Sequence, residues 1–159
     1  MRVLGIDPGL GCTGYAVVEG ELLRGEQRLV EAGAIRSDEK EPLALRLVQL
    51  HREVTAVLTE FSPTALALED LYSEYRFPRT ALLMAHARGS ICLAAGQQDV
   101  PVWSYPARQV KLTVVGNGAA SKEQVQAMVV RLFHLARTPT PNDVADAIAV
   151  AVTALRRGP

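Results

Sequence analysis

The sequence predicts an α/β protein built on one mixed, five-stranded sheet with helices on both of its faces. An apolar run ends at Asp7 and, after a glycine-rich turn, a second β-type run follows, which predicts a hairpin. Apolar positions between residues 42 and 60 recur at helical spacing, and another short apolar run covers residues 65–70. A strand, a helix and a strand in this order predict a parallel neighbour for the first strand, joined by a right-handed crossover.

The first hairpin determines where one carboxylate lies. Residues 2–7 form a short apolar run bounded by turn residues, which is typical of a buried strand. Pro8 cannot donate a hydrogen bond to a central ladder, so the strand is expected to end there. Three glycines between positions 9 and 14 allow a tight reversal before the run from 15 to 18. The hairpin therefore places Asp7 at the end of a core strand.

The remaining elements alternate along the chain. Loose alternation predicts a third strand at residues 27–36, and residues 100–105 are expected to form the last strand. Helices are expected at about 79–97 and 106–114. The predicted order is then β-β-β-α-β-α-β-α-α-α, which is typical of one sheet flanked by helices on both faces.

Start signals mark the last two helices. Ser121 is expected to cap one of them, with Gln124 in the third position of a capping box. Thr140 is expected to cap the final helix, with Pro141 as its first residue.

The earlier helix at 79–97 has apolar residues on more than one side, which its own sheet cannot cover. A two-fold dimer is expected to bury the surplus.

Length and composition indicate a folded domain. The chain has 159 residues, of which 48% are hydrophobic and 21% charged, so one domain over residues 1–159 is expected and a disordered chain is excluded. No apolar run is long enough to span a bilayer, and the first residues lack the pattern of a secretory signal. Cys12 and Cys92 offer neither a disulfide framework nor zinc spacing. A cytoplasmic location is the expectation that follows.

Acidic and basic residues are unevenly distributed along a chain of zero net charge. Residues 1–75 hold 13 acids and 7 bases, whereas residues 76–159 hold 4 acids and 10 bases. A basic half can attract a polyanion while the whole molecule stays neutral. The alternative is that both halves mix on the folded surface and leave no basic patch.

Four carboxylates are expected to meet at one edge of the sheet. Asp7 and Glu69 end two strands predicted to be parallel neighbours, and the carboxyl ends of such strands are where α/β sheets hold ligands. Asp143 and Asp146 lie three residues apart, so they share one face of the final helix. Each acid also has a purely structural alternative: a turn for Asp7, the helix dipole for Asp143 and a solvated strand end for Glu69.

Converging carboxylates select a hard cation such as Mg²⁺ over zinc. Two such ions about 4 Å apart can stabilise the attacking and leaving oxygens of an in-line phosphoryl displacement. The three histidines, His51, His86 and His134, are scattered along the chain and form no competing constellation. The acids therefore predict metal-dependent phosphoryl chemistry.

Motifs along nearly the whole chain resemble the RuvC family of Holliday-junction resolvases, within the ribonuclease H-like superfamily. The first motif is also found in sugar kinases and other actin-like ATPases, so the specificity lies in the whole set and its order. The matching stretches are Gly5-Ile6-Asp7-Pro8-Gly9, Thr13-Gly14-Tyr15, Ala67-Leu68-Glu69, Ala87-Arg88-Gly89, Ala107-Arg108-Gln109-Val110-Lys111, Thr113-Val114-Val115-Gly116, Lys122 with Gln124-Val125, and Asp143-Val144-Ala145-Asp146-Ala147-Ile148-Ala149.

The resemblance implies a homodimeric, ribonuclease H-like endonuclease that resolves four-way DNA junctions by paired, symmetric nicks in DNA recombination and repair. It implies catalytic metal ligands at Asp7, Glu69, Asp143 and Asp146, with two Mg²⁺ ions, or Mn²⁺, in each active site. It also implies a partnership with a branch-migration helicase complex of two other proteins. The DNA contacts expected on this basis are Tyr72, Arg76, Arg79, Arg108, Lys111 and Lys122.

The chain departs from the family pattern beside the glutamate. Asp70 and Tyr72 stand where the family commonly has Gln and Phe, and Glu74 lies in a segment that is more basic in some relatives. A ring is retained at Tyr72, so stacking on an unpaired base is still expected. Three other functions stay open: an actin-like ATPase or sugar kinase, which needs two such domains; a DNA-binding module without catalysis; and a related nuclease that processes ribosomal RNA.

Overall fold

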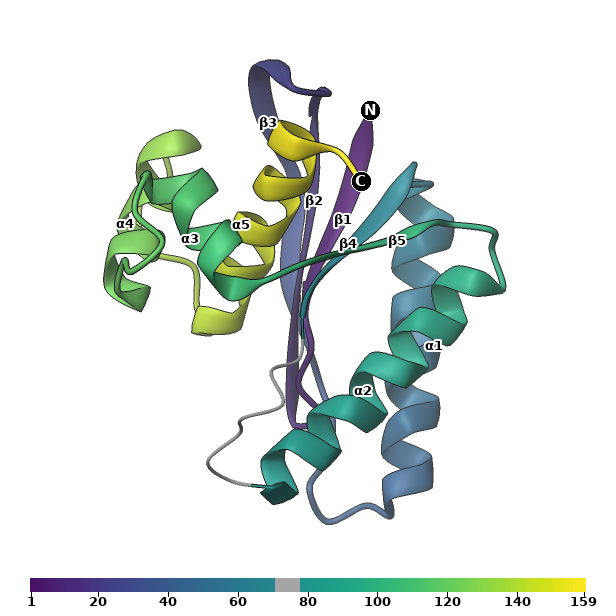
Figure 1. Cartoon of the computed structure of the whole chain (residues 1–159). Coiled ribbons are helices and arrows are strands. Elements are labelled where there is room, and N and C mark those ends of the chain that lie inside the picture. The colour runs from purple at the N-terminus through teal and green to yellow at the C-terminus, as the bar shows by residue number, and fades with distance from the viewer. Residues whose placement is uncertain (71–77) are drawn as a thin grey trace.

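The computed structural model describes residues 1–70 and 78–159, which form one five-stranded sheet between two layers of helices (Figure 1). Within these two ranges, no helix is long and apolar enough to cross a membrane. The elements in chain order are β1 (Arg2–Asp7), β2 (Cys12–Glu21), β3 (Arg24–Arg36), α1 (Leu43–Phe61), β4 (Ala65–Glu69), α2 (Pro78–Gly96), β5 (Val102–Tyr105), α3 (Ala107–Val115), α4 (Lys122–Leu132) and α5 (Asn142–Arg157).

The strands follow the order β3-β2-β1-β4-β5 across the sheet. β1 pairs antiparallel with β2 and parallel with β4, and β4 pairs parallel with β5. The predicted mixed sheet, the hairpin and the parallel neighbour of the first strand are therefore confirmed. β1 lies in the middle of the sheet, which explains why Val3, Leu4 and Ile6 have no exposed surface.

Helices α1 and α2 cover one face of the sheet (Figure 1). Leu50, Val54 and Leu58 on α1 follow one another at intervals of four residues, and all three are buried against this face. Leu66 and Leu68 of β4 point to the same side. Burial of this stripe explains why the segment is helical.

Helix α5 lies directly on the other face, with α3 and α4 packed outside it (Figure 1). Every residue of α5 from Val144 to Leu155 is buried except Asp146. The helix approaches β1 so closely that a Cβ atom at Gly5 would lie 2.3 Å from the carbonyl oxygen of Ala147. A side chain at position 5 would therefore push the helix away from the sheet.

Two helix starts were predicted from the sequence, and one of them is wrong. At α4 the capping box is present: the Gln124 amide donates to Ser121 Oγ at 3.3 Å, and the Ser121 amide donates to Gln124 Oε1 at 2.8 Å. At α5, however, Pro141 is the cap and Asn142 is the first helical residue. Pro141 has an extended ψ of 169°, so it lies outside the helix, and Thr140 does not cap it.

The predicted third strand also needs an adjustment. β3 begins at Arg24 instead of residue 27 and continues to Arg36. Its pairing with β2 shifts register twice, between Val17 and Val18 and between Gly20 and Glu21. These irregularities interrupt the alternation of inward and outward side chains along the strand. The predicted start at residue 27 depended on that alternation.

Candidate active site

The register of the sheet places two of the predicted acids side by side. Ile6 of β1 lies opposite Leu68 of β4, so Asp7 and Glu69 follow at the carboxyl ends of neighbouring parallel strands. Just beyond Asp7, the hydroxyl of Thr13 donates to the carbonyl oxygen of Gly9 at 2.6 Å and closes the turn. The predicted meeting of these two strand ends is confirmed.

A glycine brings the third acid to the same place. Gly14 on β2 pairs with Asp7 across the hairpin. A Cβ atom at Gly14 would lie 2.0 Å from the carbonyl oxygen of Asp143, so the first turn of α5 rests on the bare backbone of β2. Asp143 therefore lies in the first turn of α5, beside the end of β1.

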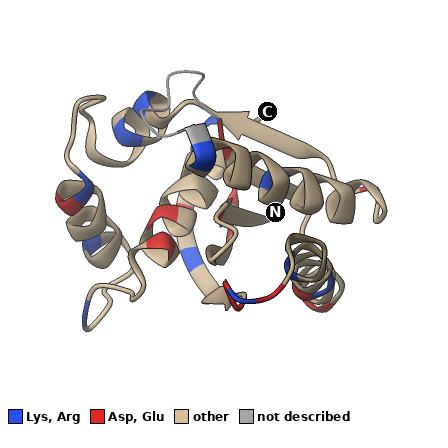
Figure 2. Cartoon of the chain, turned by 90° about the horizontal axis from the view of Figure 1, so that it is seen from below, with Lys and Arg blue, Asp and Glu red and all other residues tan. Residues whose placement is uncertain are grey.

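The fourth acid forms an ion pair with a lysine from another helix. Asp146 lies one turn further along α5, and its side chain is 18% exposed. Lys122 Nζ, at the start of α4, lies 2.6 Å from Asp146 Oδ2. Figure 2 shows the chain from below, with several acidic positions near the centre of the molecule. Asp7, Glu69, Asp143 and Asp146 are called the acid cluster from here on.

The protonation of the acid cluster reflects burial and mutual repulsion. Burial is the largest cause that raises the pKa of Asp7 to about 8, and the other three carboxylates raise it further while Lys122 opposes them. Burial, followed by the charge of Asp146, also raises the pKa of Glu69. For Asp146, burial raises the pKa in spite of the hydrogen bond from Lys122. Four acids that repel one another in a partly buried site favour a positive charge between them.

The lysine responds to the same charges. Burial by itself would lower the pKa of Lys122, but the hydrogen bond to Asp146 and the charges of the nearby acids outweigh it and raise the pKa. The ammonium is therefore kept positive at the acid cluster.

The donor set suits a hard divalent cation, because it consists of carboxylate oxygens, and the four acids outnumber the lysine that contacts them. In the part of the chain that is described, no three metal-ligating side chains already converge on one point. Lys122 instead occupies an oxygen of Asp146 for which a cation would compete. The residues fit a metal ion by their chemistry, and rotation of their side chains has to complete the ligand shell.

Two cavities flank the acid cluster, one on each side of Lys122. The first has a volume of about 200 Å³ and is lined by Glu69, Asp146, Lys111 and Lys122, among others. The second has a volume of about 660 Å³ and extends from Asp7, Asp143 and Lys122 across the glycine-rich turn to α1 and α2. Space for a ligand is therefore present beside Asp7 and Asp143 and also beside Glu69 and Asp146.

Arg88 of α2 ties this helix to the carboxyl ends of β4 and β5. Its guanidinium donates to the carbonyl oxygen of Glu69 at 2.5 Å and to Ser104 Oγ at 2.6 Å, and it lies 3.8 Å from Asp70 Oδ1. The ends of β4 and β5 are thus held by one side chain, which is 18% exposed. Asp70, where the chain departs from the family pattern, is a partner of this arginine.

The predicted DNA contacts are only partly covered by the described residues. Lys111 and Lys122 line the smaller cavity, and Arg79 lines the larger one. Arg108 is exposed near the start of α3. Tyr72 and Arg76 lie outside the described residues, as does Glu74.

Sequence reasoning missed two residues near the site. Arg46 lines the larger cavity, and it carries no motif or spacing that distinguishes it from other arginines on a helix. The role of Arg88 could have been suspected, because it belongs to one of the quoted motifs. Its partners, however, are brought together only by the fold.

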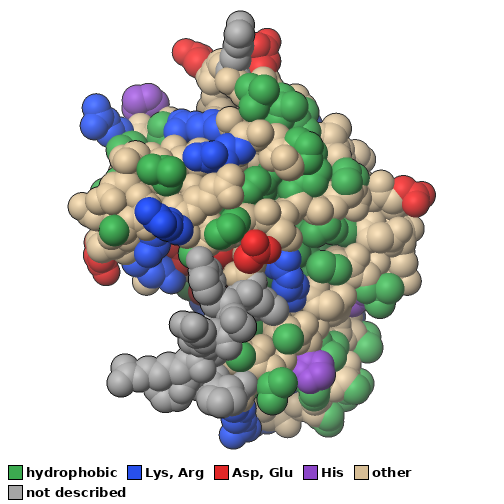
Figure 3. Space-filling model, in the orientation of Figure 1, with side chains coloured by type: hydrophobic (Ala, Val, Ile, Leu, Met, Phe, Trp, Pro, Cys, Tyr) green, Lys and Arg blue, Asp and Glu red, His purple; other side chains and the backbone are tan. Residues whose placement is uncertain are grey.

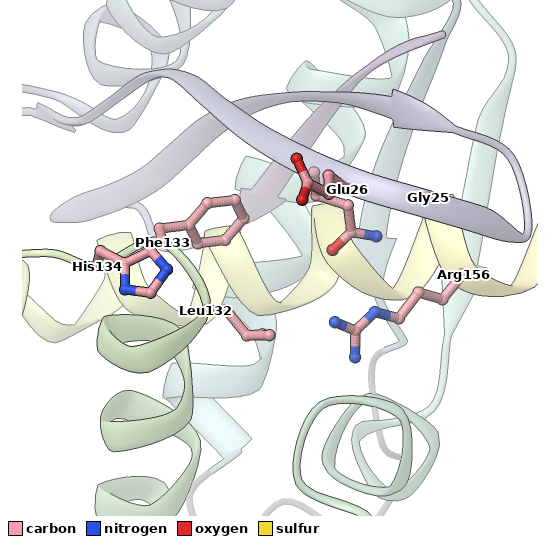
Figure 4. A pocket seen from close by; sticks show the side chains of 7 residues that line it. Gly25, Glu26, Leu132, Phe133, His134 and Arg156 are labelled. Atoms are coloured by element: carbon pink, nitrogen blue, oxygen red, sulfur yellow. The ribbon is translucent and has the colours of Figure 1, made fainter.

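A separate hollow of about 340 Å³ lies at the far end of α5, under the β2–β3 hairpin. Figure 4 shows Leu132, Phe133 and His134 at the end of α4 facing Arg156 across it, with Glu26 above. It contains none of the acid cluster and offers one carboxylate beside one arginine. It is therefore not a candidate for the phosphoryl chemistry.

Comparisons with known proteins agree with this geometry. The family model described as "Crossover junction endodeoxyribonuclease RuvC" matches residues 3–154. The protein of that name from Rhodopirellula baltica is 46% identical over 150 residues, covering 94% of this chain and 83% of its own. The one from Syntrophomonas wolfei is 41% identical over 152 residues, covering 96% of this chain and 87% of its own.

A solved structure gives the same result for the fold. The RuvC protein of T. thermophilus, solved in complex with a Holliday junction substrate, superimposes with a TM-score of 0.91. It is 36% identical in sequence, and the match covers 99% of this chain and 96% of that one. The sheet and helices described above are those of the ribonuclease H-like resolvases.

RuvC nucleases depend on a metal ion, in keeping with the donor set of the acid cluster. The chain belongs to the RuvC family of crossover junction endodeoxyribonucleases, the Holliday-junction resolvases.

Proposed function

We propose that this chain resolves four-way DNA junctions by paired, symmetric nicks and that the acid cluster is its catalytic centre. The observation that carries this proposal is that carboxylates from β1, β4 and α5 lie near one another beside Lys122, close enough for three of them to raise the pKa of the fourth, Asp7. Asp7, Glu69, Asp143 and Asp146 would hold two Mg²⁺ ions, for which Mn²⁺ is a substitute. When bound, such ions activate a water molecule and neutralise charge on the scissile phosphate.

The chain's own residues then have separate tasks. The acid cluster supplies oxygen ligands and, through its repulsion, an affinity for positive charge. Lys122 would be released from Asp146 if another cation took that oxygen, and its ammonium would then be free to contact the phosphate. Lys111, which lines the smaller cavity with Lys122, adds a second positive charge on the same side. The two lysines orient the strand for in-line attack.

DNA binding by the rest of the surface is proposed on charge and on the family resemblance. Figure 3 shows Lys and Arg side chains gathered over α3 and α4. Arg108 belongs to this side of the molecule, and Arg79 lines the cavity on the other side of the acids. Tyr72 and Arg76, in the segment that is not described, are proposed as contacts at the junction crossover through base stacking and phosphate binding.

A homodimer would give two active sites for two strands. Val48 of α1 is 62% exposed and Leu93 of α2 is 56% exposed, and both line a hollow between the two helices. Leu82 of α2 is also 63% exposed, whereas Ile91 of the same helix is fully buried inside the chain. We propose that a second copy covers this apolar surface about a two-fold axis.

The wider setting is proposed from the family. Residues 1–159 would act as one nuclease domain, in the cytoplasm, where a bacterial-type resolvase meets recombining DNA. A branch-migration helicase of two other proteins would deliver the junction. None of these points is needed for the chemistry of the acid cluster.

The decisive experiment compares substrates. Labelled four-way junction, linear duplex and RNA:DNA hybrid are incubated with the protein in Mg²⁺, in Mn²⁺ and in chelator. The proposal expects two symmetric nicks in the junction with either metal and none in chelator. Equal cutting of the RNA:DNA hybrid, or ATP turnover without cutting, would favour one of the alternative functions.

A further inference from the structure

We infer that Arg46 of α1 binds a backbone phosphate of the cleaved strand on the side of the acid cluster opposite Lys111. This inference rests on the proposed function and adds a binding site to it. The larger cavity runs without interruption from Asp7 and Asp143 to Arg46, over the turn between β1 and β2. A strand whose scissile phosphate lies at the acids has to continue into this cavity on one side.

Arg46 is anchored to the catalytic turn. Its Nε donates to Ser37 Oγ at 3.0 Å, and Ser37 Oγ donates to the carbonyl oxygen of Leu10 at 2.5 Å. The amide of Ser37 also donates to the carbonyl oxygen of Gly11 at 3.2 Å. The guanidinium is therefore fixed relative to the same turn that follows Asp7.

The two terminal nitrogens of Arg46 remain available to a ligand. Within residues 1–70 and 78–159, Nη1 and Nη2 make no hydrogen bond or ion pair. The anchored Nε leaves these two donors side by side, and such a pair can bind phosphate oxygens in a bidentate manner. Binding would cost little side-chain entropy, because the arginine is already held.

The floor of the cavity lets a backbone come close. Gly9 and Gly11 carry no side chain, and a Cβ atom at Gly11 would lie 3.9 Å from Arg46 Nη2. The turn thus presents bare peptide beneath the guanidinium, while Arg79 lies at the rim. A phosphodiester strand can follow this floor from the acids to Arg46.

Glu39 gives the cavity a second, opposing charge. Its Oε1 would lie 3.3 Å from a Cβ atom at Gly11, so it stands over the same floor as Arg46. A carboxylate there repels a phosphate and weakens the binding that Arg46 provides. Replacing it by its amide is therefore expected to tighten binding, whereas replacing Arg46 loosens it.

The test locates the contact on the DNA. Junctions are prepared with one neutral methylphosphonate at each successive position of the cleaved strand, and single-turnover cleavage is measured for each. In the unaltered protein, cleavage should fall about ten- to hundredfold at one position on a single side of the scissile phosphate. With Arg46→Ala the unmodified junction should be cut more slowly by the same factor, and the neutral linkage should then cause no further loss.

Matched variants separate this role from folding. Arg52 lies on the same helix, pairs with Glu53 at 3.1 Å and has a side chain that is 72% exposed, so Arg52→Ala makes the same charge change outside the cavity. It should leave the methylphosphonate profile unchanged. Glu39→Gln should bind the junction more tightly, and Arg46→Lys should restore part of the cleavage.

Binding in chelator gives a readout that is independent of catalysis. The slope of the logarithm of junction affinity against the logarithm of salt concentration should become shallower by about one in Arg46→Ala. The slope should not change in Arg52→Ala. If Arg46→Ala keeps the full methylphosphonate profile and the full salt slope, the inference is wrong, even though the protein cuts junctions. If the protein cuts no junction at all, it is the proposed function that fails.

Discussion

The two faces of the sheet differ in how completely the chain covers them. On the α5 face, glycine and alanine bring a helix against bare backbone, and nothing apolar on α5 from Val144 to Leu155 is left exposed. On the α1–α2 face, the sheet is covered, but the helices themselves leave Val48 and Leu93 facing outward. Tight packing against the sheet positions the acids of α5, whereas the exposed apolar residues of α1 and α2 form the surface proposed above for a second copy.

Arg88 connects the two faces. It belongs to α2, yet it donates hydrogen bonds to Glu69 and Ser104 at the carboxyl ends of β4 and β5. A change at the α1–α2 surface can therefore reach the acid cluster through this one side chain. The proposed dimer surface and the acid cluster are therefore connected by a direct contact between α2 and the strand end that carries Glu69.

Among the changes that probe the packing of the two faces, the largest effect is expected at the glycine under α5. A methyl group in Gly14→Ala would overlap the backbone of Asp143, so the first turn of α5 has to move. We expect a loss of about 2 kcal/mol or more in the free energy of unfolding and a fall in cleavage of about a hundredfold. Differential scanning calorimetry and single-turnover cleavage measure both.

Gly96→Ala is the matched control, because a Cβ atom there meets nothing within 4 Å. It should change neither cleavage nor stability by more than about 1 kcal/mol. Normal cleavage by Gly14→Ala would show that the position of Asp143 is not decisive.

The next effect concerns the apolar surface of α1 and α2. The double variant Val48→Glu, Leu93→Glu places two charges in the proposed interface and should yield a monomer in sedimentation at micromolar concentration. Symmetric cutting of a junction should become uncoordinated, because two sites no longer act on one substrate. Leu23→Glu, at a position that is 60% exposed on the β2–β3 turn, should leave assembly unchanged. A wild-type protein that is already monomeric, with and without DNA, would contradict the dimer.

A smaller effect is expected where the two faces meet. Arg88→Lys keeps the charge but loses the planar fork that reaches Glu69 and Ser104 together. Cleavage should fall about tenfold, and the Mg²⁺ concentration for half-maximal cleavage should rise, since the strand end that carries Glu69 is held less firmly. Ser104→Ala removes one acceptor and should show the same change to a lesser degree. An unaltered metal dependence beside a lowered melting temperature would assign Arg88 to stability alone.

The smallest effect is a dependence of stability on pH in the absence of metal. The pKa of Asp7 is raised from its ordinary value of 3.8 to about 8 in the folded chain, so between these values the folded state binds more protons than the unfolded state. Its contribution to the free energy of unfolding is therefore greatest in acid and is lost as the pH rises to about 8.

This contribution is removed in Asp7→Asn. We expect the fall in stability between pH 5.5 and pH 8, in chelator, to be smaller in the variant by about 1 to 2 kcal/mol. For a chain of this length, each kcal/mol changes the melting temperature by roughly 2–4 °C. Melting curves whose pH dependence is the same in both proteins would contradict the shift.

Most of the fold could be predicted because local signals and packing agree. The stripe Leu50, Val54 and Leu58 has helical spacing, and the short runs before Asp7 and Glu69 have the length and flanks of buried strands. Pro141 shows the limit: proline suits both the first helical position and the residue before it, and only the observed ψ decides between them.

The acids of the site could also be predicted, because each ends a strand or shares a helix face. What the sequence could not supply were the partners that come from distant segments. The pair Lys122–Asp146, the hold of Arg88 on Glu69 and the anchoring of Arg46 by Ser37 join residues from different elements. No periodicity connects such residues, since the connection is made by the packing of helices on the sheet.

The catalytic role of the acid cluster is tested most directly by single-turnover cleavage of a four-way junction by Asp7→Asn in Mg²⁺. The amide keeps the shape of the side chain but removes a charge and weakens a ligand. Cleavage should fall by about a thousandfold or more, while junction binding persists and the melting temperature in chelator is unchanged or higher, because repulsion in the acid cluster is relieved. Cleavage at the wild-type rate by a folded Asp7→Asn protein would contradict a catalytic metal site at these carboxylates.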